Sequence, residues 1–227
     1  AKMWEIRNEN ILFEGAQGAM LDIDSGTYPY VSSGASGSYG ASSGSGIGPR
    51  NLDKIYGVFK AYETRVGNGP MPTEFNADSE GELCDYVRKT GNEFGVTTGR
   101  ARRCGYLDLV ALRYACHVNS IDSLVLTHLD VYDDMEEIEA CVAYDIDGEL
   151  VTDFPTSIPA LNKAKPVLQK FAGWKQTIKN LSKYSQLPKN AKAYVDFIED
   201  YTGTKVGIVS VGPDRNQTFN REKIWKK

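Results

Sequence analysis

The sequence predicts an α/β fold in which a mostly parallel sheet is flanked by helices and accompanied by a small β-hairpin subdomain. Segments with apolar residues at three- and four-residue steps alternate with short apolar runs, a pattern typical of helices alternating with strands. Three of those runs end in polar turns that contain glycine or aspartate, as strands do at the ligand-binding edge of a parallel sheet. The 227 residues, 41% of them hydrophobic, are enough to bury a core.

The first predicted strand is the apolar run Ile11-Leu12-Phe13, which leads directly into the turn at residues 14–18. This arrangement puts Gln17 at the carboxyl end of a strand, where open α/β sheets bind ligands. The next segment, residues 32–48, contains seven serines and six glycines. Such a composition is typical of a flexible linker. Because Tyr39 and Ile47 interrupt it, we favour a long ligand-binding loop.

Two helices and a strand are predicted next. Five apolar residues recur at helical spacing and predict a helix that ends near Gly67, namely Leu52, Ile55, Phe59, Tyr62 and Val66. Residues 107–118 carry a second helical pattern, and residues 123–127 are a short apolar run that predicts a buried strand. A helix followed by a buried strand favours a parallel sheet.

The pattern changes after Asp130. Alternating apolar residues at 138–144, the turn Asp147-Gly148 and the run at 150–152 predict a β-hairpin. Residues 163–190 are polar and lysine-rich, so we expect peripheral helices and loops there. A helix at 191–201 closed by Gly203 and a last strand at 206–209 complete the chain.

Composition excludes several classes of protein. The net charge of −4 and the pI of about 5.3 give no general attraction to nucleic acids or anionic membranes. The four cysteines form no C-x2-C pair, which argues against a structural zinc site and favours free thiols in a reducing cytosol. The sequence shows no phosphate-binding G-x-x-x-x-G-K-[ST] motif, no signal-peptide pattern and no support for a catalytic triad.

Two motifs carry candidate chemistry. Residues 96–103 place three arginines beside two threonines and a glycine, which indicates an oxyanion site, although a solvated basic turn has the same composition. Thr127-His128-Leu129-Asp130 is similar to the [NT]-K-x-D element that reads guanine, although an aspartate after a strand is more often a helix cap or turn residue. His117, inside a helical run, is interpreted as structural.

Taken together, the order of motifs resembles the adenylosuccinate synthetase family. The motifs span nearly the whole chain and match about the C-terminal half of a family member, so we interpret residues 1–227 as a C-terminal portion, with 131–187 as a peripheral hairpin and helix subdomain. They are residues 13–18 (FEGAQG), 21–33 (LDIDSGTYPYVSS), 44–49 (GSGIGP), 64–67 (TRVG), 91–100 (GNEFGVTTGR) and 212–215 (GPDR).

The resemblance implies a fold similar to that of P-loop NTPases and a purine-biosynthetic ligase that joins IMP and L-aspartate while GTP is cleaved. In the family, the N1 proton of IMP is removed, O6 is phosphorylated by GTP, and the aspartate amine displaces the phosphate. Gln17 matches the catalytic glutamine that supports the O6 anion. Ser32 matches a threonine that binds the IMP phosphate, and Val66 and Gly67 match a segment near the ribose.

The same resemblance implies an aspartate-binding loop and a guanine site. Arg100 would hold an aspartate carboxylate close to IMP, and Arg102 would reach the GTP phosphates as well. The loop comprises Val96, Thr97, Thr98, Gly99, Arg100, Ala101 and Arg102. The residues assigned to GTP are Arg102, His128, Leu129, Asp130, Ser210, Val211 and Gly212.

Two departures from the family pattern matter. His128 stands where the family usually has lysine, which bears on base specificity. The N-terminal half, which in the family supplies the phosphate loop, the catalytic aspartate and histidine and the Mg²⁺ ligands, has no counterpart here. We therefore expect a cytoplasmic, homodimeric enzyme when whole, and a chain that is inactive and loosely folded or aggregating alone. The alternatives are a non-catalytic purine-nucleotide-binding module derived from the same fold and one half of a split enzyme.

Overall fold

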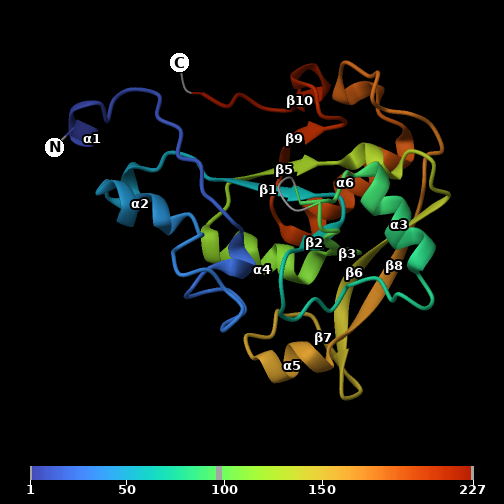
Figure 1. The fold of residues 1–227 in the computed structure, drawn as a ribbon. Helices are drawn as coiled ribbons and strands as arrows, with labels where there is room; N and C mark the ends of the chain where they lie inside the picture. The colour runs from blue at the N-terminus through green and yellow to red at the C-terminus, as the bar shows by residue number, and fades with distance from the viewer. Residues whose placement is uncertain (1, 96–98, 226–227) are drawn as a thin grey trace.

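The computed structural model describes residues 2–95 and 99–225. Its main sheet has the strand order β1-β5-β9-β10. The strands are β1 (Tyr56–Lys60), β5 (Ser123–Thr127), β9 (Val206–Ser210) and β10 (Thr218–Asn220). The first three are parallel and β10 is antiparallel. This mostly parallel sheet with flanking helices confirms the predicted fold class (Figure 1).

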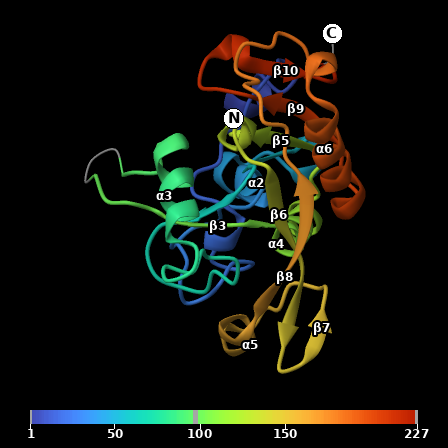
Figure 2. The same ribbon diagram turned by 90° about the vertical axis from the view of Figure 1, so that its right-hand side faces the viewer.

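The second sheet is built around a long strand, β6 (Glu137–Ile146). β6 pairs with β4 (Leu107–Asp108) in parallel, and with β7 (Glu149–Val151) and β8 (Lys165–Ala172) in antiparallel fashion. Figure 2 shows β6 and β8 running side by side away from the main sheet to β7 and α5 (Ile158–Lys163). Phe171 of β8 packs edge-on against Tyr194 with ring centroids 5.2 Å apart, so the second sheet shares the main core. The division at residues 131–187 stays a prediction.

Helices cover the main sheet and set the positions of its strands. The longest, α6 (Lys189–Thr202), contacts β8 and β9 and ends where Gly203 adopts φ 65°. α4 (Leu109–Asn119) begins where the Asp108 carboxylate accepts a hydrogen bond from Ala111 N at 2.9 Å. The core is apolar and fully buried where β5, β9 and α6 meet, at Leu124, Leu126, Val195, Ile198, Val206 and Val209.

Smaller elements lie at the periphery. They are α1 (Lys2–Glu5), α2 (Tyr39–Ser45), α3 (Gly81–Thr90) and a two-stranded antiparallel sheet of β2 (Glu63–Arg65) and β3 (Arg103–Gly105). Figure 1 shows the N-terminal segment with α1 and α2 on one side of the molecule, well away from α3. No helix in the described ranges is long and apolar enough to cross a bilayer.

The predicted helix with apolar residues from Leu52 to Val66 is wrong, because this segment forms β1 and β2. Its three- and four-residue spacing arises by coincidence, and Val66 is 71% exposed. The folded chain pairs β1 with β5 in parallel, and this pairing outweighs the local spacing that favours a helix. The predicted strand at Ile11-Leu12-Phe13 is also wrong: it has no strand partner in the described chain, and Leu12 is 75% exposed.

Two further predictions need correction. Residues 32–48 are more than a loop, because they contain the seven-residue helix α2. Residues 163–190 contain β8, which the sequence did not indicate because its apolar residues do not alternate; its pairing with β6 is interrupted by an irregularity in register. The remaining predicted elements are confirmed: the helices α4 and α6, the strands β5 and β9, and the β6–β7 hairpin turning at Asp147-Gly148. All four cysteines, each within the described ranges, are buried and free.

Candidate functional site

The carboxyl ends of three parallel strands meet at one edge of the main sheet. β1 ends at Lys60, β5 at Thr127 and β9 at Ser210. Lys60 lies opposite Thr127 in the register, and β9 pairs with the other side of β5. Two of the three predicted polar turns therefore lie at this edge. The third turn at this edge is formed by the residues after Lys60. The predicted turn that carries Gln17 does not follow a strand in the described chain.

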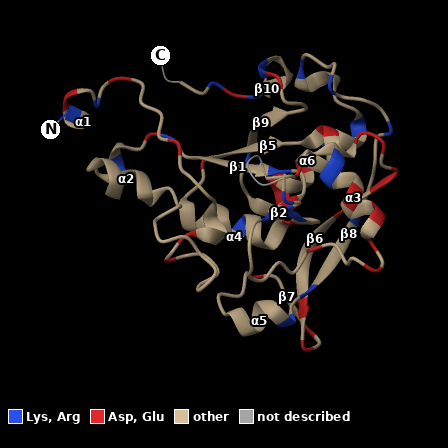
Figure 3. Ribbon diagram, viewed as in Figure 1, with Lys and Arg blue, Asp and Glu red and all other residues tan. Residues whose placement is uncertain are grey.

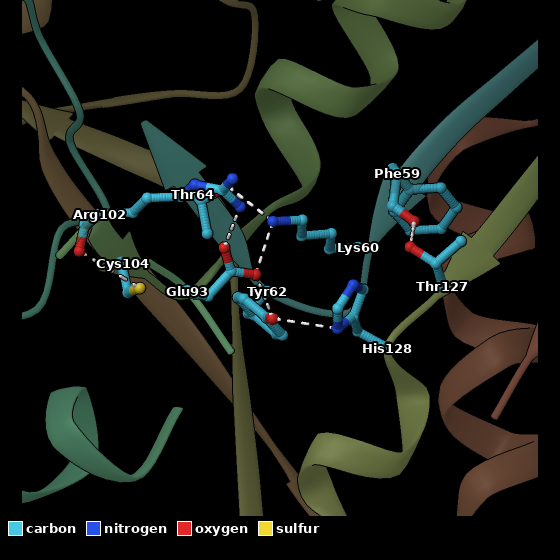
Figure 4. Close-up of polar contacts among 9 residues, drawn as sticks. All are labelled: Phe59, Lys60, Tyr62, Thr64, Glu93, Arg102, Cys104, Thr127 and His128. Carbon is cyan, nitrogen blue, oxygen red and sulfur yellow. Dashed lines mark hydrogen bonds and ion pairs between the residues drawn. The ribbon is translucent and has the colours of Figure 1, made fainter. Parts of the chain in front are cut away.

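Glu93 contacts polar side chains from two segments at this edge and is linked through Tyr62 to a third (Figure 4). Its Oε1 accepts hydrogen bonds from Lys60 Nζ at 2.6 Å and from the Tyr62 hydroxyl at 2.5 Å. Its Oε2 accepts from Arg102 Nη1 at 2.7 Å. The Tyr62 oxygen also lies 3.2 Å from His128 Nδ1. The arginine-rich segment and the turn after β5 are thus connected by one hydrogen-bonded network.

The network keeps a buried carboxylate ionised and leaves a positive excess. Burial raises the pKa of Glu93, but hydrogen bonds from Lys60, Tyr62 and Arg102 outweigh burial and leave the pKa below its usual value. Two cations face this one carboxylate, so the cluster carries one net positive charge. Such an excess beside a sheet edge suits a carboxylate or phosphate ligand.

His128 is held in an uncommon conformation. Its φ is 58°, in the left-handed region, and its ring meets that of Tyr62 edge-on at 5.7 Å between centroids. Burial first, and then the charge of Lys60, lower the pKa of His128. The imidazole is therefore neutral near pH 7.

Asp130 lies in the short turn that follows His128 and is nearly buried. Its neighbour Leu129 is fully buried and anchors the turn in the core. The Asp130 carboxylate is 3.3 Å from Lys179 Nζ, which comes from the segment between β8 and α6. A base that donates hydrogen bonds to Asp130 would therefore compete with Lys179.

The turn after β9 depends on a close approach at Gly212. Ser210 Oγ donates to the Gly212 carbonyl at 3.0 Å, and Val211 N donates to the Gln217 carbonyl at 2.9 Å. A Cβ at Gly212 would lie 2.2 Å from Gln217 Oε1. Gln217 Nε2 also donates to the Lys179 carbonyl at 3.0 Å. The turn is thus tied to the lysine that contacts Asp130.

Main-chain hydrogen bonds close the base of the arginine-rich segment. Arg102 N donates to the Glu93 carbonyl at 2.9 Å, and Gly95 N donates to the Arg100 carbonyl at 2.8 Å. Ala101 forms an antiparallel bridge with Phe94, and Gly99 has φ 64°. These contacts aim the Arg102 side chain at Glu93 and leave Arg100 exposed. The predicted aspartate-binding residues Val96, Thr97 and Thr98 lie outside the described residues.

Gln17 and Ser32 lie in a second group on the N-terminal segment. Gln17 is exposed with φ 61°, and its Oε1 is 3.5 Å from Ser36 Oγ. Ser32 Oγ donates to the Leu21 carbonyl at 2.9 Å. The buried Asp22 carboxylate organises this loop by accepting hydrogen bonds from the backbone at 24, 25, 36 and 37 and from the Tyr39 hydroxyl.

Val66 and Gly67 follow β2 and adjoin the second group. Arg65 Nη2 donates to Thr27 Oγ1 at 2.9 Å and to the Tyr30 carbonyl at 3.0 Å, which ties β2 to the loop that carries Ser32. Val66 projects into solvent. Among the described residues, no hydrogen bond or ion pair joins Gln17 or Ser32 to Arg102, His128 or Asp130. The structure thus brings the predicted site residues together in two groups.

Four polar residues were missed by sequence reasoning: Lys60, Tyr62, Glu93 and Lys179. The helix predicted through residue 66 concealed Lys60 and Tyr62 at the end of a strand. Glu93 lies in the motif at 91–100, but its spacing to Lys60 carries no signal. Within the described chain, no group of three or more His, Cys, Asp or Glu residues could hold a metal ion. Figure 3 shows acidic and basic residues interspersed over the ribbon.

Comparisons with known proteins agree on one family. A family model described as adenylosuccinate synthetase matches residues 2–219. The chain is 50% identical over 218 residues to the adenylosuccinate synthetase of Clostridium perfringens, covering 96% of this chain and 50% of that protein. It is 47% identical over 228 residues to that of Aquifex aeolicus, covering 100% of this chain and 51% of the relative.

Solved structures give the same result. The fully ligated adenylosuccinate synthetase from Plasmodium falciparum superposes with a TM-score of 0.90 at 42% identity, covering 97% of this chain and 52% of that chain. The succinoaminodeoxyadenylate synthetase of cyanophage S-2L shares the fold with a TM-score of 0.53 at 17% identity, covering 92% and 46%. The chain spans about half the length of the relatives it matches.

Proposed function

Because this chain belongs to the adenylosuccinate synthetase family, we propose that it supplies the aspartate-binding and base-recognising part of an enzyme that joins IMP and L-aspartate with cleavage of GTP. One observation carries the proposal: Arg102 and His128 share a network centred on buried Glu93 at the carboxyl edge of a parallel sheet. Ligands of open α/β folds bind at that edge.

The positive excess of the Glu93 network suits the anionic substrates. Arg102 would contact both the aspartate carboxylate and the GTP phosphates, and Arg100 would hold the aspartate close to IMP. Val96, Thr97, Thr98, Gly99 and Ala101 would complete that loop with hydroxyl and N–H donors. Forming 6-phosphoryl-IMP concentrates negative charge, so positioned cations stabilise its transition state.

The purine ends of the substrates would meet the remaining residues. Asp130 would accept from the guanine edge after displacing Lys179, with His128 and Leu129 beside it and Ser210, Val211 and Gly212 closing over the base. Gln17 would support the O6 anion of IMP, Ser32 its phosphate, and Val66 and Gly67 its ribose.

The whole activity requires chain beyond these residues. The described residues include no group of three or more His, Cys, Asp or Glu that could hold a metal ion, and the chain has no phosphate-loop motif, so we propose that the Mg²⁺ ligands and the phosphate loop come from the part of the relatives that this chain does not match. The main sheet supports this view: β1 pairs with β5 alone among described strands, and Val58 on it is 71% exposed. We further propose that the whole enzyme is a cytoplasmic homodimer.

A complementation assay tests the proposal. The 227-residue chain is assayed alone and co-expressed with a segment equivalent to the first half of a full-length relative, with adenylosuccinate measured by chromatography. We expect product only when both segments and all three substrates are present. Turnover by the chain alone, or none from the pair, would overturn it. Purine nucleotide binding with no gain of activity from the added segment would favour a non-catalytic module.

A further inference from the structure

The Tyr62 hydroxyl lies between two groups that compete for its single hydrogen. Glu93 Oε1 is 2.5 Å from the hydroxyl oxygen, and His128 Nδ1 is 3.2 Å from it on the other side. A carboxylate can only accept hydrogen bonds. Because Lys60 and Arg102 keep Glu93 ionised, the Tyr62 hydrogen is directed to Glu93.

This assignment fixes the hydrogen on His128. Since Tyr62 donates its only hydrogen to Glu93, its oxygen is left as an acceptor, and the matching donor is an N–H at His128 Nδ1. The charged groups around the ring are Lys60, Arg102, Glu93 and Asp130. Burial, together with the positive charge of Lys60, disfavours a second proton, so Nε2 is unprotonated.

We propose that Glu93 is a positioning residue that sets two side chains of the nucleotide site: it holds the Arg102 guanidinium directly and, through Tyr62, holds His128 as the Nδ1–H tautomer with Nε2 presented as a hydrogen-bond acceptor. Figure 4 shows the Nδ1 edge of His128 facing Tyr62 and the second nitrogen turned away from it. This inference rests on the proposed function in one respect, namely that the ligand beside His128 is a purine nucleotide.

The tautomer of His128 determines which groups of a nucleotide can form a hydrogen bond with the turn after β5. A lysine at this position would be a cationic donor and would pair with carbonyl or phosphate oxygens. An unprotonated Nε2 pairs instead with a donor, such as an exocyclic amino group or a ribose hydroxyl. The network thus determines the specificity of this position as well as its geometry.

Two variants separate the contact of Glu93 with Arg102 from its link through Tyr62 to His128. Tyr62→Phe removes the hydroxyl that links Glu93 to His128 and leaves the contacts of Glu93 with Lys60 and Arg102. Glu93→Gln keeps one oxygen, which can still accept from Lys60 and Tyr62, and turns its amide N–H toward Arg102. It therefore removes the contact with Arg102 and leaves the link from Tyr62 to His128. Tyr184→Phe is the matched control, because that hydroxyl is buried without a hydrogen-bond partner among the described residues.

The tautomer is measured by ¹⁵N NMR of the ligand-free, full-length protein labelled at histidine, with the His128 resonances assigned by their loss in His128→Gln. We expect a protonated Nδ1 and an unprotonated Nε2 in the native protein, a mixture of tautomers in Y62F, and no change in Y184F. A native Nε2–H tautomer, or an unchanged pattern in Y62F, would overturn the inference. Because the NMR measurement needs no turnover, it tests the tautomer even if the protein does not have the proposed function.

Kinetics supply the second readout. Loss of one hydrogen bond corresponds to about a tenfold change in binding, so we expect Y62F to raise the KM for GTP about tenfold with the KM for aspartate unchanged. Glu93→Gln should raise both KM values, because Arg102, which is assigned to the aspartate carboxylate and the GTP phosphates, loses its acceptor. If Y62F raised both equally, or neither, the link from Glu93 to His128 would be refuted. Should E93Q fail to fold, Y62F still decides.

Discussion

Arg102 Nη1 lies 2.7 Å from Glu93 Oε2, and Arg102 N donates to the Glu93 carbonyl at 2.9 Å. The two residues are therefore paired through both side chain and backbone across the base of the arginine-rich segment. The side-chain pair orients the guanidinium. Lys60 Nζ is 2.6 Å from the same carboxylate, so two cations share one negative charge. One positive charge therefore remains available to an anionic substrate.

Replacing Arg102 by leucine should impair catalysis more than folding. Glu93 Oε1 keeps Lys60 and Tyr62 as partners, so the buried carboxylate stays paired with a cation, although its Oε2 loses Arg102. A charge-assisted hydrogen bond is worth about 1.5–3 kcal/mol, so kcat/KM for aspartate should fall by about ten- to a hundredfold. Steady-state kinetics on the full-length protein measure this change. Arg7→Leu, which removes an exposed arginine bonded to the Trp4 carbonyl, is the control, and equal losses in both variants would contradict the role of Arg102.

Gly212→Ala should disturb the Asp130 region without contacting it. The added Cβ would lie 2.2 Å from Gln217 Oε1, so Gln217 must move and release the Lys179 carbonyl. We expect a loss of about 1–3 kcal/mol in unfolding free energy and a higher KM for GTP. Gly81→Ala, where a Cβ meets nothing within 4 Å, should leave the KM for GTP unchanged and, because Gly81 is the first residue of α3, should raise the unfolding free energy by up to about 1 kcal/mol. A normal KM for GTP in G212A would show that this tie does not reach the site.

Val58→Lys should act on the longer protein and spare the 227-residue chain. Val58 is 71% exposed here, and Leu150 of β7 is 69% exposed. If further chain packs against β1, V58K buries a charge there and lowers the unfolding free energy by about 1–3 kcal/mol, whereas L150K changes it by less than about 0.5 kcal/mol. Chemical denaturation of the two variants in the longer protein checks this difference, and equal effects would argue against packing at β1.

Stability should fall as the pH rises from about 4 to about 8, because of two acidic groups, Glu63 on β2 and Asp108 on β4. Burial, and then the nearby Asp108 carboxylate, raise the pKa of Glu63 to about 8, and burial raises that of Asp108 to about 6. Groups with a raised folded pKa stabilise the fold fully below their unfolded pKa, so the contribution of Asp108 is lost between pH 3.8 and about 6 and that of Glu63 between pH 4.5 and about 8. Each proton contributes a slope of at most about 1.4 kcal/mol per pH unit.

Glu63→Gln mimics the protonated acid and keeps an oxygen that can accept from Thr73 Oγ1. Its unfolding free energy should therefore change less between pH 5 and 9 than that of the native protein. Denaturation at a series of pH values measures both curves. Parallel curves would show that Glu63 does not bind the proton.

The sequence predicted the elements whose signals are local. α4 and α6 have helical apolar stripes with a cap at Asp108 and a left-handed Gly203, and the β6–β7 hairpin has its Asp147-Gly148 turn. β1 was missed because its stability comes from pairing with β5, more than sixty residues away in sequence (Tyr56 with Ser123). Local spacing cannot represent such a partner.

The candidate site divides in the same way. Arg102, His128 and Asp130 were found because they lie in recognisable motifs. Glu93 and Lys60, separated by 33 residues, meet only because β1 ends beside the arginine-rich segment. A buried carboxylate that pairs with cations distant in sequence produces no periodic pattern in the chain. The role of Glu93 could therefore be recognised only in the folded structure.

Transfer of a phosphoryl group to O6 can be followed with IMP labelled with ¹⁸O at C6. In the complemented protein with GTP and aspartate, we expect ¹⁸O in the released phosphate, one label for each adenylosuccinate formed, because O6 leaves as part of the phosphoryl group. The 227-residue chain alone should release none. Adenylosuccinate formed with unlabelled phosphate would rule out transfer to O6, and labelled phosphate released by the chain alone would rule out its dependence on a further segment.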